Sequence, residues 1–154
     1  MSRSTRFAAA VHVCAVLALE PEGRTTSDFV AGSLNTNPVV VRRILAALKR
    51  AGIARSVRGT SGGSTLARRP ADITLADIAQ AAEAPEAPPL PHRAPNPQCP
   101  VGRTIQPILA GILERAEVAR LAELRVHTLA EVLARVEHEC GTRIFPLTPQ
   151  GVSS

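Results

Sequence analysis

The chain is poor in aromatic residues and in cysteine. Its 154 residues include no Trp, no Tyr and only three Phe, which argues against a protein that binds single strands by stacking bases on aromatic rings. The three cysteines, Cys14, Cys99 and Cys140, lie far apart and form no C-x-x-C pair. An odd and sparse set of this kind argues against a secreted disulfide framework and favours a reducing compartment.

Long apolar runs are also missing. No stretch approaches the roughly 20 apolar residues that a membrane-spanning helix needs. The start of the chain has the basic and apolar layout of a signal peptide, but His12 interrupts the apolar run and no small-residue cleavage site follows Leu19. We therefore expect a cytoplasmic protein that has no membrane partner.

Enzyme signatures are absent as well. The sequence shows no paired carboxylates, no nucleophile with its base, and no phosphate loop, because the glycine-rich run 59–63 lacks the lysine of that motif. His92, Cys99, His138 and Cys140 are metal-ligand residue types, but their spacings match no usual zinc pattern. We expect neither catalysis nor a metal site.

The charge that is present is unevenly distributed. Residues 1–70 carry eleven Lys/Arg and three Asp/Glu, net +8, whereas residues 71–154 carry seven and ten, net −3. A chain of this length suffices for one domain with a core and an appended element. The first half therefore resembles a head that binds a polyanion.

The strongest local pattern is a helix that follows Asn37. Asn37 is suited to cap the helix and Pro38 to occupy its first position, while Gly52 is suited to end it. At about 100° per residue, the helix has one apolar side and one mainly cationic side. The apolar side holds Val41, Ile44, Leu45 and Leu48, and the other side holds Val39, Arg42, Arg43, Ala46, Lys49 and Arg50.

A short helix and a hairpin flank this element. Thr25 and Asp28 resemble a capping box for a helix over 26–34 whose inward residues are Phe29, Val30 and Leu34. After Gly52, two short β-type runs, 53–57 and 64–67, enclose the glycine-rich turn 58–63. Two helices with a three-residue connection, followed by a hairpin, predict a winged helix-turn-helix.

Three further helices are predicted around this unit. Thr5 is suited to cap an apolar first helix over 6–19, and Thr74 with Asp77 resembles a capping box for a helix over 75–83. Thr128 with Glu131 is suited to cap a last helix that Gly141 ends.

The second half contains a linker and a long helix. Residues 84–100 hold seven of the thirteen prolines and predict an extended linker. The pattern from 101 to about 124 predicts a long helix, which either begins near Thr104 or is kinked at Pro107. One small head cannot cover its apolar stripe, so we expect Ile105, Ile108 and Ile112 to join two copies in a homodimer.

The predicted fold is mainly α with a small β-hairpin, a winged helix-turn-helix head and a long dimerisation helix. We expect a DNA-binding head over 1–83, the proline-rich linker 84–100, a unit of two helices over 101–140, and a disordered tail over 141–154.

Several segments together resemble the Rrf-two family of bacterial winged-helix transcriptional regulators. They are TRFAAAVHVCAVLAL, TNPVVVRRILAALKRAGIARSVRGTSGGSTLAR, ADITLADIAQA and the CPVG start of the long helix, within a similarity over residues 5 to about 137. The resemblance implies a homodimer whose two heads read a partly palindromic operator in double-stranded DNA, usually for repression.

The resemblance also assigns DNA contacts by position. The major-groove set is Thr36, Asn37, Pro38, Val39, Val40, Arg42 and Arg43. The set for the minor groove or the phosphates is Arg58, Gly59, Thr60, Ser61, Gly62 and Gly63.

Many members of this family hold an iron-sulphur cluster with three closely spaced cysteines before the long helix. Only Cys99 stands there in this chain, and a cluster needs several thiolates, so we expect no cofactor. Some cluster-free members respond through single thiols. A mobile segment near a helix N-terminus favours thiolate chemistry at Cys99, and Cys14 is a second candidate. The alternatives are an inert Cys99 thiol and a Cys14 that only packs in the core.

Two functions fit these patterns. The first is a dimeric, sequence-specific transcription regulator, most simply a repressor, that responds to a thiol reaction or a ligand. The second is an adaptor whose winged helix binds another protein without specific DNA binding. The concentration of arginine and lysine in one third of the chain favours the regulator.

Overall fold

The computed structural model describes residues 2–20, 25–60, 62–83 and 95–145. The described elements follow in the order α1 (Arg3–Leu19), α2 (Ser27–Leu34), α3 (Pro38–Arg50), β1 (Ala54–Val57), β2 (Gly63–Leu66), the 3-10 helix η1 (Pro70–Asp72), α4 (Leu75–Ala82), α5 (Pro100–Arg125) and α6 (Leu129–Cys140). The expected fold class, mainly α with a small β-hairpin, is confirmed.

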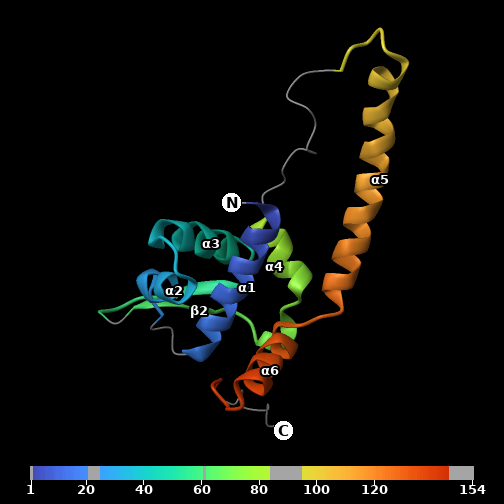
Figure 1. Cartoon of the computed structure of the whole chain (residues 1–154). Helices are drawn as coiled ribbons and strands as arrows, with labels where there is room; N and C mark the ends of the chain where they lie inside the picture. The colour runs from blue at the N-terminus through green and yellow to red at the C-terminus, as the bar shows by residue number, and fades with distance from the viewer. Residues whose placement is uncertain (1, 21–24, 61, 84–94, 146–154) are drawn as a thin grey trace.

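Helices α1 to α4 and the hairpin form one head, and α5 extends along its side and beyond it (Figure 1). Helix α1 packs against α3, α4 and strand β2, and so lies at the centre of the head. Its apolar sides explain this place, because Val13, Cys14 and Leu17 are fully buried. The core also takes residues from each neighbouring element, among them Val30, Val41, Leu48, Ile53, Ile73 and Ile78.

The signals around α3 are confirmed. The Asn37 side chain accepts a hydrogen bond from the Val39 N–H at 2.8 Å, and Pro38 occupies the first turn. Gly52 follows the helix with φ +68°, a left-handed conformation that glycine adopts without a Cβ penalty. Val41, Ile44, Leu45 and Leu48 are buried, as the helical periodicity predicts.

The hairpin is a two-stranded antiparallel sheet with Ala54 opposite Leu66 and Val57 opposite Gly63. Its inner edge is covered by Thr25, whose carbonyl accepts a hydrogen bond from the Ser64 N–H at 2.8 Å. This bridge was not predicted, since a single residue gives no strand pattern. It ties the wing to the segment that enters α2.

Two helix starts differ from the prediction. Helix α1 begins at Arg3, because the Ser2 hydroxyl accepts a hydrogen bond from the Thr5 N–H at 3.2 Å, so Thr5 is not the cap. Helix α2 is capped by Thr26, whose hydroxyl accepts from the Phe29 N–H at 3.2 Å, while Thr25 is used in the bridge to the wing.

The predicted inward position of Phe29 is wrong. Its side chain is 59% exposed, whereas Val30 and Ala31 are buried. The buried face of α2 is therefore formed by Val30 and Ala31, and Phe29 lies outside it.

The two later capping signals are confirmed. Thr74 and Asp77 form a complete capping box at the start of α4. The Thr128 hydroxyl accepts from the Glu131 N–H at 3.3 Å at the start of α6, and Gly141 ends that helix with φ +68°.

Helix α5 is continuous over 26 residues and starts at Pro100 rather than near Thr104. Pro107 is therefore an interior residue, and the Arg103 carbonyl lacks the N–H that a helix usually offers it. No residue of α5 is buried. Much of the helix is thus not covered by the other described residues of the chain.

Helix α6 packs on the head. The Leu129 N–H donates to the Ile73 carbonyl at 2.8 Å, and the Leu75 N–H donates to the His127 carbonyl at 2.9 Å. Leu129 and Leu133 belong to the core of the head. The sequence pattern predicts one unit of 129–140 with the long helix, whereas these contacts connect α6 to the head.

The first residues of the expected tail fold back on α6. The backbone N–H groups of Ile144 and Phe145 donate to Glu137 Oε1 at 2.9 and 2.8 Å. These bonds lower the pKa of the Glu137 carboxyl. The rest of that tail, 146–154, and most of the expected linker, 84–94, lie outside the described residues.

Candidate DNA-binding surface

The outer face of α3 presents cations to solvent. Arg42, Arg43 and Arg50 are exposed, and Val39 beside them is 46% exposed. The opposite side of the same helix is buried in the core, and this burial sets the direction in which the cationic face points. An exposed, cationic helix with an apolar residue in its first turn suits the major groove, where a methyl group marks thymine.

A groove of about 360 Å³ runs beside this face, between α3, the start of α2 and strand β2. Its lining includes two cations, Arg42 and Lys49, and no carboxylate. The other lining residues are Thr25, Thr26, Ser27, Leu45, Ala46, Gly62, Gly63 and Ser64. Cations together with hydroxyl groups can hold a phosphate oxygen.

The two groove cations are oriented by hydroxyl groups. Arg42 Nε donates to Ser27 Oγ at 3.4 Å, and Lys49 Nζ donates to Ser56 Oγ at 2.8 Å. Lys49 thus joins α3 to strand β1 of the wing. Sequence reasoning placed Lys49 on the cationic face but not in the contact set, and it missed Ser27 and Ser56.

The tip of the wing depends on glycine. Gly59 has φ +127°, and its carbonyl accepts from the Gly62 N–H at 3.0 Å. A Cβ on Gly62 would lie 2.5 Å from the Val57 carbonyl oxygen, closer than real contacts allow. Arg58 and Thr60 are exposed at this tip, and Ser61 lies outside the described residues.

The predicted major-groove set does not share one environment. Asn37 is exposed at the start of α3, whereas Thr36 and Pro38 are half-buried. Val40 is half-buried and packs against the core. Within this set the residues that face solvent are therefore Asn37, Val39, Arg42 and Arg43.

The three cysteines lie in different environments. Cys14 is fully buried, and burial raises the pKa of its thiol to about 12. Cys140 is exposed at the end of α6, and Cys99 is exposed immediately before α5, where its side chain makes no capping hydrogen bond.

This placement does not fit an iron-sulphur cluster. Such a cluster needs several thiolates, and one of the three sulphurs in this chain lies inside the core. Among the described residues, no group of three or more His, Cys, Asp or Glu side chains is arranged to hold a metal ion.

The expected dimer residues are exposed on α5. Ile105, Ile108 and Ile112 are 38%, 57% and 47% exposed. Val101, Leu109 and Leu113 are exposed on the same helix. In the part of the chain that is described, no helix is long and apolar enough to cross a membrane.

A short helix, a recognition helix with exposed cations and a glycine-tipped hairpin define a winged helix-turn-helix DNA-binding protein. The family model described as Rrf2, iron-dependent transcriptional regulator, matches residues 3–135. The chain therefore belongs to the Rrf2 family, as the sequence resemblance indicated.

Relatives agree with this assignment. The chain is 38% identical over 130 residues to the "Putative HTH-type transcriptional regulator YwnA" of Bacillus subtilis, covering 84% of this chain and 96% of that one. It is 34% identical to a crystal structure of a "putative DNA binding protein", with a TM-score of 0.64 over 82% of this chain and 97% of the other.

The chain is also similar to the solved structure of CymR, the global cysteine regulator of B. subtilis. The two sequences are 25% identical, and the TM-score is 0.59 over 88% of this chain and 98% of that one. These relatives confirm the interpretation as a DNA-binding transcription regulator, and the family model carries the same description of a transcriptional regulator.

Proposed function

We propose that the protein is a homodimeric repressor whose two heads read a partly palindromic operator. Helix α3 enters the major groove, and the wing contacts the minor groove or the phosphates. The observation that carries the proposal is the exposed cationic face of α3 beside a groove lined by Arg42, Lys49 and hydroxyl groups. A surface of this kind attracts the phosphate backbone, while its first turn reaches base edges.

Within this surface the residues have different roles. We assign base reading to Arg43 and Val39, because both are exposed on α3. We assign phosphate binding to Arg42 and Lys49, because both line the groove. We assign a minor-groove contact to Arg58, because it is exposed at the tip of the wing and narrow A·T-rich segments attract arginine.

Binding-site selection on random duplexes, followed by salt titration, tests the proposal. We expect an enriched, partly palindromic sequence. In the double variant Arg42→Ala, Arg43→Ala, each arginine that reads a base should cost about 1 to 3 kcal/mol, and each that meets phosphate should lower the salt slope by about 1.

The matched control is Arg125→Ala, Arg135→Ala, which removes the same charge from exposed positions at the end of α5 and on α6. It should bind almost as the wild type does. Equal operator binding by the wild type and the Arg42, Arg43 variant would reject this face. Absence of any selected sequence would favour the adaptor function instead.

A further inference from the structure

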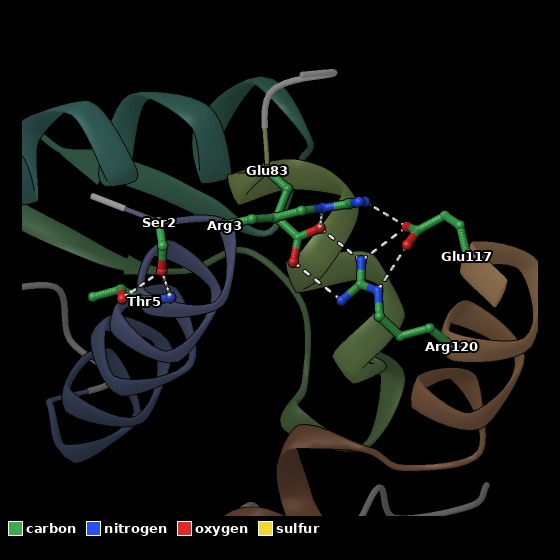
Figure 2. Close-up of polar contacts among 6 residues, drawn as sticks. All are labelled: Ser2, Arg3, Thr5, Glu83, Glu117 and Arg120. Carbon is green, nitrogen blue, oxygen red and sulfur yellow. Dashed lines mark hydrogen bonds and ion pairs between the residues drawn. The ribbon is translucent and has the colours of Figure 1, made fainter. Parts of the chain in front are cut away.

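Four charged side chains meet where α5 passes the head (Figure 2). Arg3 comes from α1, Glu83 directly follows α4, and Glu117 and Arg120 come from α5. Arg120 Nη2 lies 2.6 Å from Glu83 Oε2, and Arg120 Nη1 lies 3.1 Å from Glu83 Oε1. Arg3 forms ion pairs with both Glu83 and Glu117. We call these four residues the α5 clamp.

Glu83 is the central residue of the α5 clamp. Its side chain is only 3% exposed, and it occupies the C-terminal end of α4, where the helix dipole disfavours a negative charge. A buried carboxylate is stable only when it is paired and hydrogen-bonded. Arg120 supplies two parallel N–H donors and Arg3 a third, so the position of Glu83 depends on α1 and α5 together.

The α5 clamp restricts the orientation of α5 relative to the head more strictly than the apolar contacts of this helix do. No residue of α5 is buried, and Leu121 and Leu124, near the clamp, are only half-buried. Apolar contacts of this kind tolerate sliding and tilting. The two-pronged pairing of Arg120 with Glu83 does not, because both N–H bonds must be aligned at once.

We propose that Glu83 is a positioning residue for DNA recognition, which sets the angle between the head and α5 through Arg120 and Arg3. The inference rests on the proposed function, in which two copies of α5 join the heads. Recognition helices of a dimer must lie about 34 Å apart to enter successive major grooves. A small change in the angle between the head and α5 would move α3 of each head away from that spacing.

The first test is the variant Glu83→Gln, which keeps the size and removes the charge. Its control is Glu139→Gln, which removes the same charge from an exposed position on α6. Each protein is titrated with a duplex that carries one half-site and with a series of full operators whose half-site spacing changes by single base pairs. Sedimentation velocity records the oligomeric state.

For Glu83→Gln we expect a folded dimer with wild-type affinity for one half-site. Its affinity for the best full operator should fall by about tenfold, because the second head no longer binds at the effective concentration of a fixed dimer. Its dependence on spacing should flatten. A merely structural residue would lower affinity for every duplex alike. The wild-type spacing profile in a folded, dimeric Glu83→Gln protein would overturn the proposal.

A second variant covers the case in which Glu83→Gln does not fold. Replacing a buried ion pair by apolar residues of similar volume is often neutral or stabilising, so Glu83→Met with Arg120→Met should remain folded. We expect this double variant to be as stable as the wild type but to show the flattened spacing profile. A sharp, wild-type profile in the double variant would equally overturn the proposal.

The experiment distinguishes a failure of the positioning role of Glu83 from a failure of the proposed function. If the wild type selects no operator, the proposed function is rejected, and the positioning role of Glu83 that rests on it is rejected as well. If the wild type prefers one spacing sharply and both clamp variants do the same, the proposed function stands and the positioning role of Glu83 is rejected.

Discussion

The three cysteine side chains differ in their exposure to solvent and therefore in their expected reactivity. Cys14 has no exposed surface and a pKa raised to about 12, so its reactive thiolate is scarce at neutral pH. Cys99 is exposed at the start of α5, the helix proposed to join the two heads, whereas Cys140 is exposed at the end of α6. A reaction at Cys99 is therefore the one best placed to alter the dimer.

We predict that a thiol-reactive electrophile modifies Cys99 and Cys140 in the native protein, and Cys14 only after unfolding. Mass spectrometry of native and denatured samples measures this directly.

We further expect mild peroxide to weaken operator binding by the wild type, Cys140→Ser and Cys14→Ser, but not by Cys99→Ser. Unchanged wild-type binding after oxidation would leave a ligand-responsive or constitutive repressor.

The role of a single residue could be predicted from the sequence where it depends on contacts with residues only a few positions away. Asn37, Pro38 and Gly52 mark the ends of α3 through contacts within a few residues, and all three act as predicted. The position of Phe29 failed because it depends on where α2 rests in the core. Glu83 was missed because its partners are 80 and 37 positions away, and no periodicity reveals such pairs.

At the scale of elements, the wing shows how strongly a turn can restrict one residue. A Cβ at Gly62 would lie 2.5 Å from the Val57 carbonyl oxygen and 2.9 Å from that of Gly59. Both obstacles are backbone atoms, which cannot rotate away. The hairpin would have to deform to accept any other residue.

We predict that Gly62→Ala destabilises the protein by about 1 to 3 kcal/mol, since the backbone of the wing must shift. Operator affinity should fall as Arg58 loses its position. The control is Gly32→Ala in α2, where a Cβ meets nothing within 4 Å. Removing a helix-interior glycine there should stabilise by about 0.5 to 1 kcal/mol. Denaturant unfolding measures both, and an unchanged stability of Gly62→Ala would contradict the described turn.

Elements were predicted better than their arrangement. The hairpin and the helices were found because caps, glycines and apolar periodicity are properties of short segments. The docking of α6 on the head was not found, because it depends on hydrogen bonds between Ile73 and Leu129 and between Leu75 and His127, which join distant segments. The roles of the DNA-facing residues stay predictions.

At the scale of the whole molecule, two features of α5 have to be explained together. The helix carries six large, exposed aliphatic residues from Val101 to Leu113, and none of its residues is buried. Exposed apolar surface of this extent on one helix marks an interaction site. Because the α5 clamp holds the later part of the helix against the head, the earlier part remains available for a second copy.

We predict that Ile108→Asp with Ile112→Asp converts a dimer into a monomer with a folded head. The head should survive because neither isoleucine is buried in it. Sedimentation velocity and far-UV circular dichroism measure the two properties. The control is Val126→Asp with Ile144→Asp, which places the same charges at exposed apolar positions outside the stripe, and it should remain dimeric.

The monomer should also lose the advantage of two linked heads. Its affinity for a single half-site should match that of the wild type, whereas its affinity for the full operator should fall by roughly 10² to 10⁴, the usual gain from linking two binding events. A double variant that still sediments as a native dimer would place the interface elsewhere. A monomer that binds the full operator as tightly as the wild type would show that one head suffices for recognition, and the palindrome would then have no role in affinity.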